Sequence, residues 1–313
     1  MNTVFLNTAG KEYPALVFGS WQLGGVYQFG GKADGLGEIA VDTASGLLER
    51  AYESGIRVFD TADIYGLGRV ETLMSRLPED AFIITKFGNR GSADKRRKDF
   101  SPAYFISCVE KSRRRLSREP NLILMHNPPT EFRFGQLDHF ELDRLRDEGL
   151  VKSFGISCTT VTQAERALEN RHVQAVEVNF NLTDRRAENT LFGRARELKK
   201  DLFLRAPFCS GFLTNRFLER DHEFEQNDRR SGLVPEDRYW RIRATRTMAE
   251  SLGIDSITET ALRFCLSFPH FIVVGCRSID QLEANIRYAA SGGLDAATLQ
   301  RIRQIELGDN PCW

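Results

Sequence analysis

Short apolar runs alternate with amphipathic stretches along most of the chain. Eight of the runs have the length and the β-branched or aromatic content of buried strands; they cover residues 15–18, 56–59, 81–85, 122–125, 153–156, 175–178, 202–204 and 271–274. Apolar residues at helical spacing lie between them, at 44–52, 102–116, 138–148, 161–169, 186–199 and 236–252. Short buried strands separated by helices predict a parallel sheet covered by helices. Eight such units in 313 residues favour a (β/α)8 TIM barrel over an open doubly wound sheet.

The other segments predict how the barrel is completed. Residues 1–14 indicate a short polar hairpin, and residues 279–307 indicate a helical tail. Residues 24–41 are rich in glycine and predict a loop. The longest irregular segment, residues 209–235, precedes the last strand, and such a segment is often a lid or a binding loop. Because no composition shift or flexible linker divides the chain, we predict that residues 1–313 form one domain.

The charge balance and the cysteines narrow the classes of partner. Basic and acidic residues number 43 each, so no net field attracts the chain to nucleic acid or to an anionic membrane. No apolar run approaches the length of a membrane span, and the amino terminus lacks the features of a signal peptide. The six cysteines do not have the spacing of a metal site. We therefore expect a cytoplasmic protein that acts on a small molecule without a metal; the sequence gives no oligomeric state.

Polar residues that follow three consecutive strands could carry chemistry together. Asp60, Lys86 and His126 follow the second, third and fourth strands, and Tyr65 lies in the loop after the second. A phenol has a pKa near ~10 and is a weak acid at neutral pH unless a cation lowers that value. On a barrel these residues would meet at the carboxyl-terminal face, where barrel enzymes hold their sites. We expect Tyr65 to donate a proton, Lys86 to lower its pKa, Asp60 to hold the ammonium and His126 to orient a carbonyl oxygen.

Several motifs, in order along nearly the whole chain, resemble those of the aldo-keto reductase family. They are FDTADIYG at 59–66 with GxGxxE at 66–71, ITKFG at 84–88, LILMHNP at 122–128, FGIS at 154–157 and VVGCRSIDQLEAN at 273–285. The resemblance implies a (β/α)8 barrel, a nicotinamide cofactor that is usually NADPH, and a catalytic tetrad of Asp60, Tyr65, Lys86 and His126. It also implies hydride transfer from the nicotinamide C4 to a carbonyl carbon.

The same resemblance assigns further residues to the cofactor and the substrate. Ser157 would hold the nicotinamide carboxamide, and Trp21 would contact the substrate. The adenosine end would be held by Gly275, Arg277, Ser278, Gln281 and Asn285. Because the guanidinium of Arg277 can hold a 2′-phosphate with paired hydrogen bonds, we expect NADP(H) rather than NAD(H).

Three positions depart from the family's usual pattern, all of them near the expected nicotinamide. Cys158 stands where the family commonly has Asn, Glu177 where it has Gln, and Arg205 where it has an aromatic residue that stacks on the nicotinamide. A thiol is a weaker hydrogen-bonding group than an amide, whereas a carboxylate can accept from an amide and a guanidinium can stack on a ring. Our hypothesis is that Glu177 and Arg205 form a charged replacement for the polar–aromatic pair, and that the three residues contribute to cofactor binding.

The expected function is that of an NADP(H)-dependent oxidoreductase that reduces an aldehyde or ketone, or oxidises the alcohol, with Tyr65 as general acid or base. One alternative is a barrel that binds NADP(H) as a sensor or partner subunit with little turnover. Another is metal-assisted hydrolysis by Asp60, Asp63 and His126, against which the ammonium of Lys86 argues. The charged residues of 209–235 favour a polar substrate, such as a sugar or hydroxylated aldehyde, over an apolar ketone.

Three other patterns indicate no site. Residues 35–40 match the dinucleotide motif GxGxxA, but they follow a loop rather than a strand. The basic runs at 95–98 and 113–115 lack the interleaved aromatics of a nucleic-acid groove. Attraction of an acidic substrate by residues 95–98 stays a weaker hypothesis.

Overall fold

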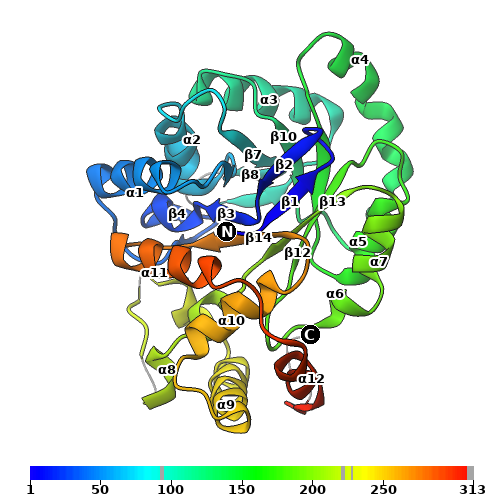
Figure 1. Cartoon of the computed structure of the whole chain (residues 1–313). Coiled ribbons are helices and arrows are strands. Elements are labelled where there is room, and N and C mark those ends of the chain that lie inside the picture. Colours follow the sequence, from blue (N-terminus) through cyan, green and yellow to red (C-terminus); the bar gives the residue numbers. More distant parts are fainter. Residues whose placement is uncertain (92–94, 220–222, 227, 309–313) are drawn as a thin grey trace.

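The strand–helix alternation folds into a closed barrel in the computed structural model of the chain, which describes residues 1–91, 95–219, 223–226 and 228–308 (Figure 1). Eight parallel strands pair in the order β10-β11-β12-β13-β14-β3-β6-β7, and β7 pairs with β10 to close the ring. Their bounds are β3 (Leu16–Gly19), β6 (Val58–Asp60), β7 (Phe82–Phe87), β10 (Leu122–His126), β11 (Phe154–Ser157), β12 (Ala175–Asn179), β13 (Asp201–Arg205) and β14 (Phe271–Gly275). The predicted (β/α)8 fold class is confirmed.

Helices surround the barrel (Figure 1). Within the described residues they are α1 (Val41–Glu53), α2 (Arg69–Met74), α3 (Pro102–Leu116), α4 (Leu142–Asp147), α5 (Val161–Leu168), α6 (Arg186–Asn189), α7 (Leu191–Glu197), α8 (Arg216–Glu219), α9 (Pro235–Leu252), α10 (Ile257–Leu266), α11 (Ile279–Ala290) and α12 (Ala296–Gln304). Two predicted helices are interrupted. The stretch 138–148 is divided between the 3-10 helix η3 (Phe134–Phe140) and α4, because Glu141 has a left-handed φ of 51°. The stretch 186–199 is divided at Thr190, whose φ is −133°.

The predicted amino-terminal hairpin consists of β1 (Thr3–Leu6) and β2 (Lys11–Pro14). Leu6 and Tyr13 belong to the apolar cluster inside the barrel, and the Tyr13 ring meets Phe82, at the start of β7, with its centroid 5.8 Å away. The backbone N–H groups of Asn7 and Thr8 donate to the carboxylate of Asp201, at the start of β13. The hairpin therefore covers the amino-terminal end of the barrel and leaves the opposite face for polar groups.

Two loops on that opposite face contain hairpins where the sequence predicts irregular chain. One is β4 (Tyr27–Phe29) with β5 (Lys32–Asp34), and the other is β8 (Asn89–Gly91) with β9 (Arg96–Lys98). The 209–235 segment contains the 3-10 helices η4 (Cys209–Gly211) and η5 (Arg229–Gly232) beside α8. It contacts the loop that carries the first hairpin, because Arg229 N donates to Gly35 O at 3.1 Å. The loops after β3 and β13 therefore meet across the carboxyl-terminal side.

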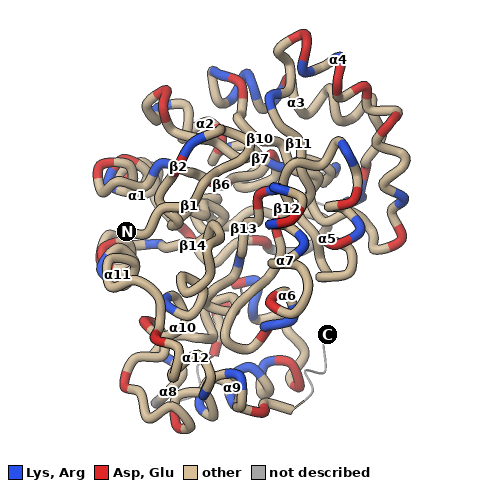
Figure 2. Tube along the Cα trace, turned by 45° about the vertical axis from the view of Figure 1, so that its right-hand side comes forward, with Lys and Arg blue, Asp and Glu red and all other residues tan. Residues whose placement is uncertain are grey.

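Basic and acidic residues are mixed along the outer helices (Figure 2). This distribution agrees with the equal numbers of the two charges. None of the described helices is both long and apolar enough to span a membrane.

Candidate active site

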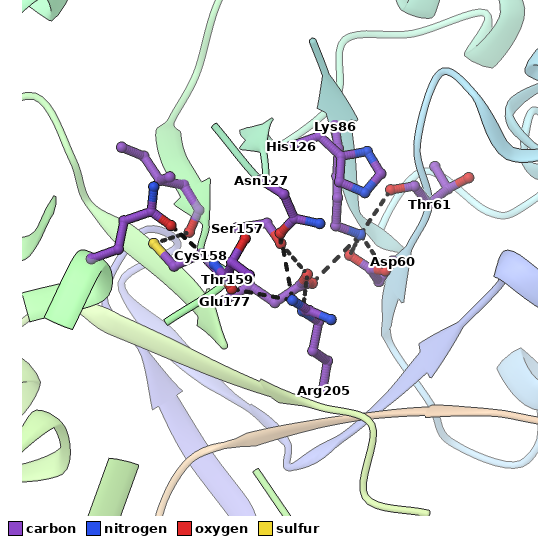
Figure 3. Close-up of polar contacts among 12 residues, drawn as sticks. Asp60, Thr61, Lys86, His126, Asn127, Ser157, Cys158, Thr159, Glu177 and Arg205 are labelled. Carbon is purple, nitrogen blue, oxygen red and sulfur yellow. Dashed lines mark hydrogen bonds and ion pairs between the residues drawn. The ribbon is translucent and has the colours of Figure 1, made fainter. Parts of the chain in front are cut away.

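The alternation of side chains along the barrel strands brings the polar strand ends together. Successive residues of a strand point inward and outward in turn. The lower interior positions are apolar and include Val58, Ile84, Leu124, Ala175 and Phe203. Two residues further along the same strands, the interior positions hold Asp60, Lys86, His126, Glu177 and Arg205. A ring of charged and polar groups therefore lies next to the apolar layer of the barrel, and Figure 3 shows its members together.

The centre of this ring is the ion pair between Lys86 and Asp60. The Lys86 Nζ lies 2.6 Å from both carboxylate oxygens of Asp60 and donates to the Thr61 carbonyl at 3.1 Å. Lys86 is 1% exposed and Asp60 is 3% exposed. Two charges so deeply buried are stable only when they are paired. The predicted pairing of the two residues is thus present in the structure.

Glu177 and Arg205 extend the pair into a cluster of four charges, which we call the charge quartet (Asp60, Lys86, Glu177 and Arg205; Figure 3). A Glu177 oxygen lies 3.5 Å from Lys86 Nζ, and the other lies 3.4 Å from Arg205 Nε. Glu177 is 2% exposed. Two cations and two anions give the quartet no net charge. This arrangement supports the hypothesis that Glu177 and Arg205 occur as a pair, although their role toward a cofactor stays a prediction.

Tyr65 lies above the quartet at the start of the 3-10 helix η2 (Tyr65–Gly68). Lys86 Nζ is 5.3 Å from the centroid of the Tyr65 ring, and the His126 ring meets the same ring edge-on at 6.0 Å. The turn approaches the loop after β3 so closely that a Cβ on Gly66 would lie 2.8 Å from Gly24 O. Glycine at position 66 therefore lets the two loops pack together beside Tyr65. All four residues of the predicted tetrad lie in one place.

The ionisation of these groups follows from burial and from their neighbours. Burial lowers the pKa of Lys86, but Asp60 and Glu177 outweigh that effect and raise the pKa above its usual value. Burial raises the pKa of Glu177, yet Lys86 and Arg205 hold it below the usual range. Burial raises the pKa of Asp60, and the Glu177 carboxylate adds to this. Lys86 lowers the pKa but does not cancel the rise.

The phenol of Tyr65 differs from the expectation. Burial raises its pKa to about 12; Lys86 lowers it, whereas Asp60 and Glu177 raise it. Lys86 thus acts in the expected direction, but the expected net lowering of the pKa is wrong. The reason is that burial and two nearby carboxylates outweigh one ammonium. The phenol consequently keeps its proton at neutral pH.

Ser157 lies among polar groups that face the same region. Its Oγ donates to Glu177 Oε1 at 2.8 Å and is 3.2 Å from Asn127 Oδ1. Cys158 differs, because its side chain is fully buried and its thiol contacts the Ile156 carbonyl. Its backbone carbonyl, rather than its thiol, accepts from Arg205 Nη2 at 3.1 Å. The thiol of Cys158 is therefore turned away from the predicted nicotinamide site.

The residues predicted for the adenosine end gather where β14 leads into α11. Ser278 Oγ accepts from Gln281 N at 3.2 Å, and Gln281 Oε1 accepts from Arg277 N at 2.8 Å, so these residues cap the helix. Asn285 is buried on the same helix, and Gly275 ends the strand. The guanidinium of Arg277 donates to the carbonyls of residues 36 and 38, and its buried Nε has no partner.

Trp21, predicted to contact substrate, begins the 3-10 helix η1 (Trp21–Gly24) directly after β3. The guanidinium of Arg229 lies 5.4 Å from the centroid of its indole ring. Next to it, the Gln22 side chain covers Gly275, where a Cβ would lie 2.0 Å from Gln22 Nε2. Trp21 thus lies in the loop after β3, on the carboxyl-terminal face, and contacts the loop after β13.

Two asparagines in the site were not predicted. Asn127 has a left-handed φ of 52° and brings its Oδ1 within 3.4 Å of Arg205 Nη2. Asn89 Nδ2 lies 3.0 Å from His126 Nδ1. Asn127 directly follows His126, and Asn89 lies three residues after Lys86. This closeness to a predicted tetrad residue was the sequence signal that could have identified them. Amides are too common in loops for that signal to identify them from one sequence.

Asp63, considered above as a metal ligand, has Glu71, Cys108 and Arg115 as the neighbours of its carboxylate, rather than members of the ring. Burial raises its pKa to about 8, and the nearby Glu71 carboxylate adds to this. Among the described residues, no group of three or more His, Cys, Asp or Glu side chains is arranged to hold a metal ion.

The sequence also matches known proteins. The model of the aldo/keto reductase family matches residues 15–307. An uncharacterized oxidoreductase of Bacillus subtilis, YqkF, is 28% identical over 288 residues, which cover 87% of this chain and 89% of that protein. D-threo-aldose 1-dehydrogenase of a Pseudomonas species is 25% identical and covers 90% of this chain and 91% of its own.

Solved structures have the same fold. The glycerol dehydrogenase of Gluconobacter oxydans superposes with a TM-score of 0.77 at 23% identity, covering 96% of this chain and 94% of its own. An aldo/keto reductase of Klebsiella pneumoniae, in complex with NADP and acetate, gives a TM-score of 0.68 at 17% identity, with coverage of 96% and 94%. At these identities the superpositions show the fold alone, whereas the family match extends over nearly the whole sequence. The chain therefore belongs to the aldo/keto reductase family and is an oxidoreductase.

Proposed function

We propose that the protein is an NADP(H)-dependent carbonyl reductase, or alcohol dehydrogenase in the reverse direction, with Tyr65 as its proton donor and acceptor. The observation that carries the proposal is the buried Lys86–Asp60 pair, at 2.6 Å, directly beneath the Tyr65 ring. A buried cation beside a phenol stabilises the phenolate that forms when the proton leaves. No other described group of this site joins a proton donor with such a fixed cation.

Each tetrad residue has a role that its contacts support. The pKa of Tyr65, raised to about 12, keeps the phenol protonated and ready to donate to a developing alkoxide. Asp60 holds Lys86 under the phenol. With Asn89 Nδ2 as donor, His126 Nδ1 accepts, so the proton of the neutral ring is on Nε2 and can bind a carbonyl oxygen. In alcohol oxidation the same phenol must first lose its proton, which favours high pH.

Polar atoms near the quartet fit a nicotinamide carboxamide. Buried atoms without a hydrogen-bond partner include Glu177 Oε2, Asn179 Oδ1 and Arg205 Nε. Two of these are acceptors for an amide NH2, and the Ser157 hydroxyl and Arg205 guanidinium can donate to an amide oxygen. The bound nicotinamide would supply the hydride, and these residues would orient its ring. The guanidinium of Arg205 would face the ring where relatives commonly use an aromatic side chain.

The preference for NADP(H) over NAD(H) rests on Arg277. Its guanidinium contacts backbone carbonyls of the loop after β3, and its Nε is unpaired, so one donor is available for a phosphate oxygen. Ser278 and Gln281 hold the backbone of Arg277 in the connection from β14 to α11 through the cap of that helix. The NADP complex of the Klebsiella protein, which has this fold, agrees with the assignment. Relatives named for an aldose and for glycerol add support for a hydroxylated substrate.

The test is NADPH oxidation with a panel of aldehydes and ketones, run on wild type, Tyr65→Phe and a control. We expect Tyr65→Phe to lose about 10²–10⁴-fold in kcat, the range of general acid catalysis, while it still binds NADPH by fluorescence titration. The control, Tyr52→Phe, removes a phenol that bonds Asp80 on the surface, and it should keep full activity. Binding of NADPH without turnover in wild type would instead favour a sensor or partner subunit. The same assay with NADH measures the cofactor preference.

A further inference from the structure

One buried carboxylate, that of Glu71, joins three elements next to the candidate active site. Glu71 belongs to α2 and is 0% exposed. Its Oε1 accepts from Thr85 Oγ1, on β7, at 2.7 Å, and its Oε2 accepts from Arg115 Nη1, on α3, at 2.9 Å. A buried carboxylate is costly unless it is paired and hydrogen-bonded. The two partners meet that requirement, and Glu71 thereby ties β7 to both helices.

On one side this network reaches the strand of Lys86. Thr85 directly precedes Lys86 on β7 and is 1% exposed. Because successive side chains of a strand point to opposite faces, Thr85 faces the helices while Lys86 faces the interior of the barrel. The bond from Thr85 to Glu71 therefore acts on the backbone that carries the Lys86 ammonium.

On the other side the network reaches the loop of Tyr65. The same Nη1 of Arg115 that binds Glu71 also donates to the Asp63 carbonyl at 3.2 Å. Asp63 lies two residues before Tyr65, and its backbone N–H donates to the Lys86 carbonyl at 3.1 Å. One guanidinium thus joins the loop that carries the phenol to the carboxylate that holds β7.

Glycine at position 68 makes room for this guanidinium. Gly68 has a left-handed φ of 95°, and a Cβ there would lie 2.2 Å from the Cζ of Arg115. Arg115 therefore lies against the backbone of η2, the turn that Tyr65 begins. It is the last residue of the basic run 113–115, and it differs from its neighbour Arg114, which is exposed on the same helix.

The nearby Asp63 carboxyl does not compete with Glu71 for Arg115. Burial raises the pKa of Asp63 to about 8, the Glu71 carboxylate adds to this, and the Cys108 thiol and Arg115 lower it. Asp63 is consequently mostly neutral at pH 7. Glu71 is then the carboxylate that pairs with Arg115, and Asp63 takes part through its backbone carbonyl.

We propose that Glu71 and Arg115 are positioning residues for the reaction in which Tyr65 transfers the proton. Together with Thr85 they hold the phenol over the Lys86 ammonium, whose Nζ lies 5.3 Å from the centroid of the phenol ring. The attraction between an ammonium and a phenolate weakens with distance, and a misplacement of about 1 Å can cost about 10²-fold in rate. The inference rests on the proposed reductase function and adds to it residues that act through the tetrad.

Thr85→Val is the sharpest test, because valine has nearly the shape of threonine and leaves every charge in place. It removes the hydroxyl bound to Glu71, so a change in the chemistry of this variant comes from position alone. Arg115→Ala removes the other link. Because the Arg115 side chain is 32% exposed, guanidinium added from solution can reach the vacated position as a chemical rescue. Arg114→Ala is the matched control on the same helix.

The four proteins are assayed for carbonyl reduction, for alcohol oxidation across pH, for NADPH affinity by fluorescence titration and for stability in urea. We expect Thr85→Val and Arg115→Ala to lose about 10–10²-fold in kcat with unchanged NADPH affinity. Burial raises the pKa of Tyr65 and Lys86 opposes this, so a phenol held less firmly over Lys86 should move the alkaline limb of oxidation to higher pH. Guanidinium should restore activity to Arg115→Ala but not to Thr85→Val, and Arg114→Ala should match the wild type.

A different outcome overturns the inference. If Thr85→Val loses stability in urea but keeps the kcat and the alkaline limb of the wild type, the network serves only the fold, and the reductase function still stands. Thr85→Val decides this even if Arg115→Ala does not fold. If the wild type turns over no member of the carbonyl panel, the proposed function fails and this inference fails with it.

Discussion

Glu177 and Arg205 are the second ion pair of the charge quartet. Removing the charge of Glu177 and removing the charge of Arg205 should shift the pKa of Tyr65 in opposite directions. Glu177 raises the pKa of Tyr65, whereas Arg205 lowers it. Glu177→Gln leaves a net positive quartet and should move the alkaline limb of the alcohol-oxidation profile to lower pH. Arg205→Gln leaves a net negative quartet and should move that limb to higher pH. The double variant restores neutrality and should return the limb toward the wild-type position.

The same variants test whether the pair is coupled energetically. Two unit charges 3.4 Å apart attract by about 5 kcal/mol at an effective dielectric constant of about 20, and the Glu177–Arg205 contact has that length. Desolvation cancels part of this, and the Arg205 side chain keeps 27% exposure, so its charge is partly screened. Glutamine at position 177 can also keep the contact with Ser157. We therefore expect each single variant to lose about 1–3 kcal/mol of unfolding free energy, with a coupling of at least about 1 kcal/mol.

The assays are urea unfolding of the four proteins and the pH profile of kcat/KM for alcohol oxidation, with NADPH affinity measured alongside. The pH profile is informative because, if Glu177 and Arg205 served only the fold, the single variants would lose stability but would not move the alkaline limb in opposite directions. Additive losses of stability in the double variant would show that the two charges do not interact. Shifts of the two single variants in the same direction would refute the electrostatic reasoning, and unchanged cofactor affinity in Glu177→Gln would remove the pair from the cofactor site.

Two further predictions concern stability. Burial lowers the pKa of His270 to about 4, below its unfolded value of about 6.5, so the unfolded chain binds the extra proton and stability falls as pH drops from 6.5 toward 4. His270→Phe should make unfolding between pH 7 and 5 less pH-dependent by about 2 kcal/mol; an identical pH dependence would contradict this. Gly155→Ala should cost about 1–3 kcal/mol, because its Cβ would lie 2.4 Å from Ala175 O. Gly193→Ala, with open space in α7, should instead gain about 0.5–1 kcal/mol, and equal effects would refute the steric argument.

The barrel was predictable because each strand is a short run buried on both faces. Composition alone distinguishes such runs from loops, so β7 and β10 are found within two residues of their predicted ends. The hairpin β4–β5 was missed because it lies in a glycine-rich segment whose three-residue strands are too short to stand out from a loop. The break at Glu141 was missed for a similar reason, since a left-handed glutamate leaves no signal in helical periodicity.

The tetrad was predictable, but its energetics were not. Asp60 and His126 end strands, Lys86 is the last residue but one of its strand, and strand parity alone places all three inside the barrel. The pKa of Tyr65 depends instead on burial and on how many charges surround it, and neither quantity is written in the local sequence.

The departures from the family pattern become understandable once the quartet is considered as one unit. A glutamate alone at position 177 would place a second carboxylate beside Asp60 with a single ammonium between them, and burial would then force a proton onto one of them. An arginine alone at position 205 would place a second cation beside Lys86. Together they keep the buried charge at zero, with contacts of 3.4 and 3.5 Å. Glu177 and Arg205 can therefore be replaced by neutral residues only when both are replaced together. For this reason the double variant, and neither single variant, should resemble the wild type in the alkaline limb of its pH profile.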